Sequence, residues 1–193
     1  MEPASIFGLV KGAFEAIKGV FGVVAPKLDL TYEAGKTPYA QSDATVFWRL
    51  NDPDESGHAA TATQLTGTRR WYQVGVRNRS LQTVDDVRVE LASIDPPAIA
   101  HLPLALEIMH GAPQPLTLHR AKEPTIFAAV VLKVDEDTRI HVMSAPRLPR
   151  DLGGLPAGRY RLAIRVTGRN TPAVTRHYVA DVGERGQLTF AQE

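Results

Sequence analysis

Short apolar segments separated by proline and glycine are the feature of this sequence that most limits its fold. The chain of 193 residues contains 14 prolines and 15 glycines, spread between runs in which apolar and polar residues alternate. Alternation with a period of two is typical of strands with one buried face, and frequent turns favour many short strands over long helices. The sequence therefore predicts a mainly β fold over most of its length.

Two neighbouring segments, 69–78 and 84–94, alternate most clearly. In the second, Val87, Val89 and Leu91 fall on one face, and Arg88 and Glu90 fall on the other. A short polar turn separates the two segments, so we expect them to form an antiparallel hairpin with one solvent-facing side.

The remaining strands are predicted from shorter patterns of the same kind. The continuous apolar run 125–134 is consistent with a fully buried strand. Residues 51–67 are rich in small polar residues and predict a long surface loop. The other expected strands are 27–33, 45–50, 139–143, 161–167, 173–182 and 187–190.

A resemblance to a known fold enters at Tyr160. The pattern Leu155-x-x-Gly158-x-Tyr160, followed by an alternating strand, resembles the penultimate strand of immunoglobulin-like and fibronectin-type sandwiches. The same folds have a central hairpin, which the following two patterns resemble: Val74-x-Val76-x-Asn78 and Val87-x-Val89-x-Leu91. The resemblance covers about residues 69–182 and implies an immunoglobulin-like antiparallel β-sandwich. It also implies that Tyr160 forms a structural tyrosine corner, and it leaves the function open.

Residues 5–26 follow a different, helical period. Apolar residues recur in alternating steps of four and three, and three phenylalanines stand one heptad apart. The expected assembly or membrane face comprises Ile6, Phe7, Val10, Phe14, Ile17, Val20, Phe21 and Val24. The polar face comprises Lys11, Glu15 and Lys18. We therefore predict one N-terminal amphipathic α-helix in residues 1–26, followed by an immunoglobulin-like β-sandwich in residues 27–193.

This predicted helix has three possible roles. It could lie in a membrane interface with its phenylalanines buried, it could bundle with copies of itself, or it could pack on its own sandwich. A lone membrane-spanning helix is disfavoured, because two lysines and a glutamate near its middle would each cost about 2.5–3.5 kcal/mol. A signal peptide is not expected either, because Met1, Glu2 and Pro3 carry no positive charge and charged residues interrupt the apolar stretch.

Composition and motifs narrow the class of function. The net charge of +1 does not favour nucleic acid, and the absence of cysteine excludes thiolate metal sites and cysteine nucleophiles. His101, His110 and His119 match no metal-ligand spacing. No phosphate-binding loop or nucleophile elbow occurs in the sequence. We therefore expect no enzymatic activity, no cofactor, no metal and no small-molecule substrate.

The predicted function is that of a structural or adaptor protein without catalysis. Its helix would mediate self-assembly into a homo-oligomer or attachment to a membrane surface, and its sandwich would bind a protein partner. The expected location is the cytoplasm, and attachment to the membrane periphery is left open. The alternative is a membrane-active effector, whose amphipathic helix inserts into and perturbs bilayers under control of the sandwich.

Overall fold

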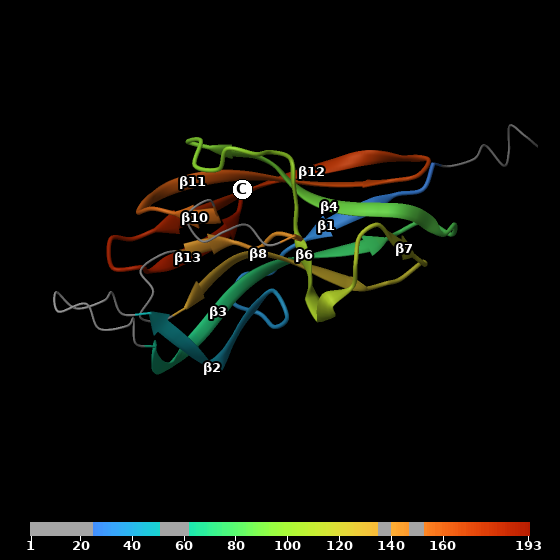
Figure 1. The fold of residues 1–193 in the computed structure, drawn as a ribbon. Helices are drawn as coiled ribbons and strands as arrows, with labels where there is room; N and C mark the ends of the chain where they lie inside the picture. The colour runs from blue at the N-terminus through green and yellow to red at the C-terminus, as the bar shows by residue number, and fades with distance from the viewer. Residues whose placement is uncertain (1–24, 51–61, 135–139, 147–152) are drawn as a thin grey trace, which may run out of the picture.

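Two antiparallel sheets stacked on a common core make up the fold (Figure 1). The computed structural model describes residues 25–50, 62–134, 140–146 and 153–193. Within these ranges the chain is mainly β, as predicted, and it includes the 3₁₀ turn η1 (Met109–Gly111). The predicted helix of residues 4–25 lies almost wholly outside the described residues.

The strands of the two sheets follow the chain in a mixed order. The first sheet contains β1 (Leu28–Thr31), β2 (Ala40–Leu50), β3 (Ala62–Asn78), β6 (Glu107–Ile108), β8 (Ile126–Val134), β9 (Ile140–Val142) and β10 (Gly154–Leu155). The second contains β4 (Val84–Asp95), β5 (Leu104–Ala105), β7 (Leu116–Leu118), β11 (Gly158–Gly168), β12 (Thr171–Val182) and β13 (Leu188–Gln192). Neighbours run β1-β3-β8-β9-β10 in the first sheet and β13-β12-β11-β4-β5 in the second.

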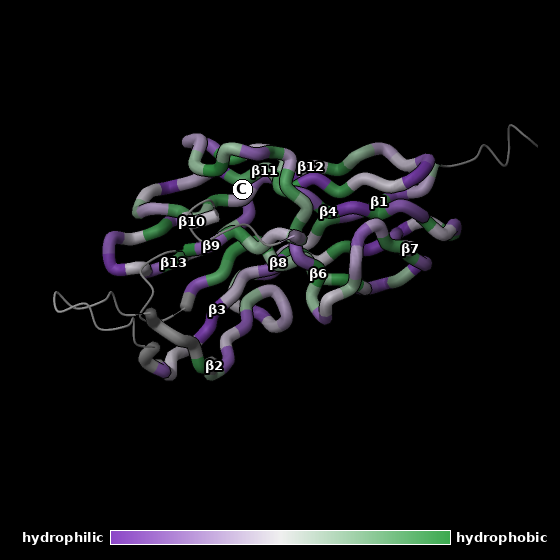
Figure 2. Tube along the Cα trace, viewed as in Figure 1, coloured by the Kyte–Doolittle hydropathy of each residue, from purple (hydrophilic) through white to green (hydrophobic). Residues whose placement is uncertain are grey.

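The core lies between the facing sides of the two sheets. Figure 2 shows hydrophobic residues gathered along the inner strands of both layers. The first sheet contributes Val74 and Val76 of β3, and the second contributes Leu162, Ile164 and Val166 of β11, all of them fully buried. Each set occupies alternate positions of its strand, as a strand with one buried face requires. The alternation seen in the sequence therefore identifies core-facing residues correctly.

One predicted pairing is wrong. Segments 69–78 and 84–94 do not form a hairpin, because β3 belongs to the first sheet and β4 to the second. The turn between them is closed by Asn78, whose fully buried side-chain amide donates to Gln82 O at 2.6 Å and to Leu118 O at 3.0 Å. The short polar segment is thus a crossover between layers, which periodicity alone cannot distinguish from a hairpin turn.

The predicted loop 51–67 is also corrected in part. Residues 62–67 belong to β3 and pair in register with β2, while residues 51–61 are outside the described part of the chain. The strands expected at 161–167, 173–182 and 187–190 are present near the C-terminal end. Antiparallel ladders join β11 to β12 and β12 to β13.

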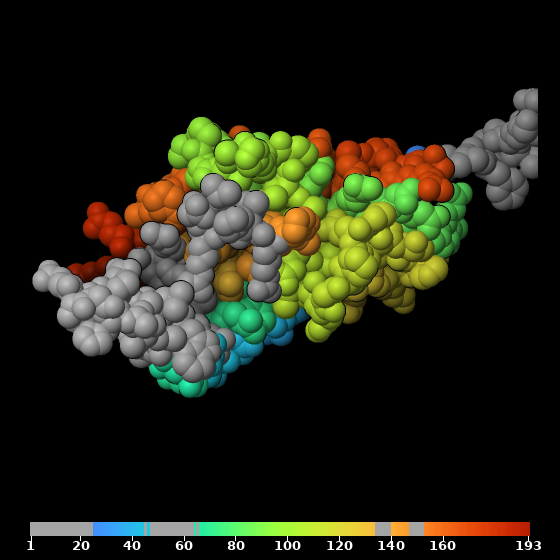
Figure 3. Space-filling model, in the orientation of Figure 1, coloured from blue at the N-terminus to red at the C-terminus, as the bar shows by residue number. Residues whose placement is uncertain are grey.

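The long connection from β4 to β8 spreads over the front of the molecule (Figure 3). The side chain of Gln114 fixes part of it, since its Oε1 accepts from Val89 N at 2.7 Å and its Nε2 donates to Leu106 O at 2.6 Å. These bonds satisfy backbone groups of β4 and of the connection at once. The connection therefore behaves as part of the sandwich and carries three short strands.

Candidate functional site: an arginine cluster on Asp29

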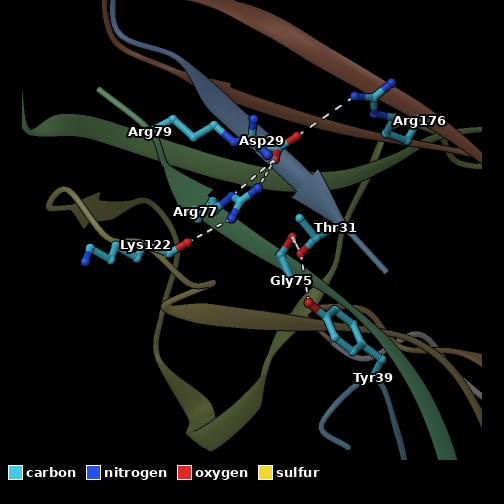
Figure 4. A network of polar contacts seen from close by, with 8 residues as sticks. All are labelled: Asp29, Thr31, Tyr39, Gly75, Arg77, Arg79, Lys122 and Arg176. Carbon is cyan, nitrogen blue, oxygen red and sulfur yellow. Dashed lines mark hydrogen bonds and ion pairs between the residues drawn. The ribbon is translucent and has the colours of Figure 1, made fainter. Parts of the chain in front are cut away.

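The candidate site lies where β1 pairs with the last residues of β3. Leu28 and Leu30 of β1 point into the core and are 5% and 2% exposed. Side chains alternate along a strand, so Asp29 lies on the other side of the strand, directly opposite Arg77 of β3. Figure 4 shows the carboxylate of Asp29 among the guanidinium groups of Arg77, Arg79 and Arg176.

Asp29 and Arg77 form a partly buried ion pair. The Nε and Nη2 of Arg77 donate to Asp29 Oδ2 at 3.2 and 3.0 Å, and its Nη1 donates to Lys122 O at 2.8 Å. The two side chains are only 13% and 21% exposed. The guanidinium of Arg77 donates to two acceptors, the Asp29 carboxylate and Lys122 O, and these bonds hold it in one orientation.

Two further arginines approach the same carboxylate. Arg79 Nη2 lies 2.7 Å from Asp29 Oδ2, and Arg176 Nη2, reaching across from β12, lies 3.9 Å from Asp29 Oδ1. Their side chains are 55% and 49% exposed. Three guanidinium groups share one carboxylate, so the cluster keeps a net excess of two positive charges. Exposed guanidinium groups of this kind can bind carboxylate or phosphate oxygens of a partner.

Thr31, two residues after Asp29 and on the same face of β1, also anchors the strand. The Thr31 hydroxyl lies 3.1 Å from Tyr39 Oη and donates to Gly75 O at 3.4 Å. A Cβ on Gly75 would stand 2.8 Å from both Thr31 Oγ1 and Pro124 Cβ, so only glycine allows this approach. The close contact fixes β1 against β3 and, with it, the position of Asp29.

The cluster also lies beside the first described residues of the chain. The backbone N–H of Arg79 donates to Lys27 O at 2.8 Å, and the Thr171 hydroxyl donates to Pro26 O. Whatever precedes Pro26 therefore joins the sandwich next to the arginine cluster. The side chain of Lys27 is exposed at the same place and adds a further cation.

Of the residues predicted as sites, only Tyr160 is described. It is 4% exposed at the start of β11, its hydroxyl donates to Pro156 O at 3.0 Å, and burial raises its pKa. The predicted helical faces are outside the described residues: Ile6, Phe7, Val10, Phe14, Ile17, Val20, Phe21 and Val24, with Lys11, Glu15 and Lys18.

Sequence reasoning missed the arginine cluster. The two arginines flanking Asn78 and the acidic residue of β1 were visible in the sequence, but nothing there shows that β1 pairs with the end of β3. Arg176 comes from the other sheet, almost a hundred residues from Arg79. Only the three-dimensional packing brings these groups together.

The rest of the described chain offers fewer candidates. One hollow of about 140 Å³ is lined by Arg70, Tyr72, Lys133, Gln187 and Leu188. Among residues 25–50, 62–134, 140–146 and 153–193, no three acidic or histidine side chains converge as metal ligands would. Nor does any helix in those ranges have the length and apolar character needed to cross a membrane.

Comparisons with known proteins add no relative. No protein-family model matches the chain, and no curated protein or solved structure matches it.

Proposed function

We propose that this chain is a non-enzymatic adaptor attached to an anionic membrane surface. The observation that carries the proposal is the position of the arginine cluster, directly beside the point where the N-terminal segment joins the sandwich. The predicted amphipathic helix would enter the interface with its apolar face. Arg79, Arg176 and Lys27 would face the lipid headgroups, and the opposite end of the sandwich would be free to bind a protein partner.

The energetics support two cooperating signals. A positive side chain near an anionic leaflet contributes about 1 kcal/mol, and the attraction falls off within a Debye length. The predicted helix carries four glycines, Gly8, Gly12, Gly19 and Gly22, which weaken it when it is isolated. Anchoring by one weak apolar element becomes stable when a basic patch is added. The anionic leaflet of this kind faces the cytoplasm, which agrees with the proposed location.

We also propose that the sandwich is immunoglobulin-like. The neighbours β1-β3-β8 and β4-β11-β12 occupy the chain positions of strands A-B-E and C-F-G of that fold. The remaining strands would then be additions between or after these six. The bond from the Tyr160 hydroxyl to Pro156 O, four residues upstream at the start of β11, supports a tyrosine corner there.

Vesicle binding tests the attachment. The full chain should cosediment with phosphatidylserine-containing vesicles more strongly than with neutral phosphatidylcholine vesicles, and added salt should weaken the binding. The double variant Arg79→Glu/Arg176→Glu reverses two charges of the cluster. It should lower the affinity for the anionic vesicles at least about tenfold, given the contribution per charge.

A matched control uses two exposed arginines from the opposite end of the sandwich. The variant Arg159→Glu/Arg185→Glu makes the same change of net charge away from the cluster. It should bind nearly as well as the unaltered chain. Equal losses in the two double variants, or equal binding to neutral and anionic vesicles, would rule out the arginine cluster as a lipid contact.

A further inference from the structure

The ribbon formed by β2 and β3 extends past the rest of its sheet. Ala40–Leu50 of β2 pair with Tyr72–Ala62 of β3, but β8 accompanies β3 only from Arg69 onward. Among the described residues, 44–50 and 62–68 therefore have no third strand. Figure 1 shows this ribbon at the end of the molecule away from the start of β1. Two strands alone are marginally stable in water, so a further strand would stabilise the ribbon.

The outer edge of β2 is a long open edge of the described fold. Other edge strands are short: β5 has 2 residues, β7 has 3, β10 has 2 and β13 has 5. By contrast, β2 has 11 residues and contains neither proline nor lysine, which proteins commonly use to prevent edge pairing. Within the described chain β2 forms its ladder with β3 alone, so its second row of backbone N–H and C=O groups faces outward.

The residues along this edge suit strand pairing. Val46 is 52% exposed, and Ser42, Asp43 and Ala44 beside it are exposed as well. The sequence DATVFWR is rich in β-branched and aromatic residues, which favour strands and form stabilising cross-strand pairs.

The charges of β2 are arranged symmetrically about Val46. Asp43 stands three residues before it and Arg49 three residues after it. If two copies of β2 pair antiparallel with Val46 opposite Val46, Asp43 of each copy stands opposite Arg49 of the other. A shift by one residue would place Asp43 opposite an uncharged residue instead. Symmetric dimers use one self-complementary patch in this way.

We propose that β2 binds the same edge of a second copy of this chain in this register. The two ribbons then form a continuous sheet across the dimer. Within its own chain, Asp43 already accepts hydrogen bonds from Nε and Nη2 of Arg69, yet its side chain remains 45% exposed. It can therefore accept a second guanidinium, as Asp29 does at the other end of the first sheet. This inference is independent of membrane attachment, since the two surfaces lie at different ends of the sandwich.

Light scattering of the full chain, without lipid, tests the dimer. The unaltered chain should be dimeric at micromolar concentration. Val46→Lys places two ammonium groups against each other on the dyad and should yield monomers. Leu81→Lys makes the same apolar-to-lysine change at an 81% exposed position and should leave the dimer intact. A monomeric unaltered chain, or a Val46→Lys variant that remains dimeric, would overturn the proposal. The second of these results would point to assembly through residues 5–26.

A charge exchange tests the register itself. Asp43→Lys and Arg49→Asp each create two like-charge contacts in a homodimer, so each variant alone should dissociate at least about tenfold more readily. In a mixture of the two variants, every contact is again between opposite charges, and heterodimers should form. If the mixture associates no better than its components, the register is refuted. Thermal unfolding of each variant shows whether the fold itself has survived.

Discussion

Two strands, β1 and β2, pair with the same edge of β3. They carry similar ion pairs but differ in how deeply those pairs are buried. Along the same edge of β3, β1 pairs with residues 75–78 and β2 pairs with residues 62–72. Each half contains an aspartate directly opposite an arginine, and in each pair the arginine donates through Nε and Nη2. The Asp29–Arg77 side chains are 13% and 21% exposed, whereas the Asp43–Arg69 side chains are 45% and 42% exposed.

Packing around the pair explains the difference. Leu28 and Leu30 fix β1 in the core, and Arg176 reaches it from the second sheet. From Ala44 onward, the ribbon of β2 and β3 has no third strand beside it among the described residues. The comparison indicates that β1 is fixed by the core and by the second sheet. The exposed edge of β2 leaves room for the additional strand that we propose. The predictions below test this contrast, beginning with the largest effect.

Truncation of an apolar side chain should give the largest difference in stability between a change in β1 and the matching change in β2. Leu30→Ala in β1 should lower the free energy of unfolding by about 3 kcal/mol, because it leaves a cavity in the core. Val46→Ala in β2 should change it by less than about 0.5 kcal/mol in the monomer, since Val46 is half exposed. Urea unfolding of the two variants provides the measurement. Similar losses would mean that β2 is as firmly packed as β1.

The two ion pairs give the next contrast. Asp29→Asn removes the negative charge that three arginines share, one of them mostly buried, and should cost about 2 kcal/mol. Asp43→Asn breaks an exposed pair and should cost about 0.5 kcal/mol. The same unfolding assay at low and high salt measures both. High salt should reduce the cost of Asp43→Asn more, because exposed charges are screened.

These contrasts also show how far sequence reasoning reaches. Alternation identified the strands and the buried residues of β11, because burial of one face is a property of the strand itself. It paired β3 with β4 wrongly, because pairing depends on where the chain crosses between layers, and at this crossing the buried Asn78 amide bonds to Gln82 O and Leu118 O. The arginine cluster was equally invisible, since Arg176 meets Asp29 only after both sheets are stacked.

The β2 half was predicted least well for a related reason. Residues 62–67 are small and polar, which is typical of loops, yet they form the beginning of the longest strand. Backbone hydrogen bonds to β2 hold these residues in a strand, although their side chains have little preference for one. Local composition therefore underestimates a strand whose stability comes from a neighbouring strand, and the same dependence makes this ribbon suited to a further strand from a second copy.

Tyr32, directly after β1, provides a smaller effect than Leu30 or Asp29, together with a pH signature. Its hydroxyl donates to Phe190 O at 2.7 Å, joining the β1 half to β13 of the second sheet. Tyr32→Phe should cost about 1 kcal/mol at neutral pH because that bond is lost. Burial, with a smaller contribution from Tyr72, raises the pKa of Tyr32 to about 12.

The sign of the pH effect follows from this shift. Between pH 10 and about 12 an unfolded chain loses the Tyr32 proton while the folded chain keeps it. Stability contributed by the neutral hydroxyl is therefore complete below pH 10 and is lost as the pH rises toward 12. The unaltered chain should lose stability faster than Tyr32→Phe over this interval, so the difference between them should narrow. A constant difference in urea midpoints would show that Tyr32 does not link β1 to the second sheet through its protonated hydroxyl.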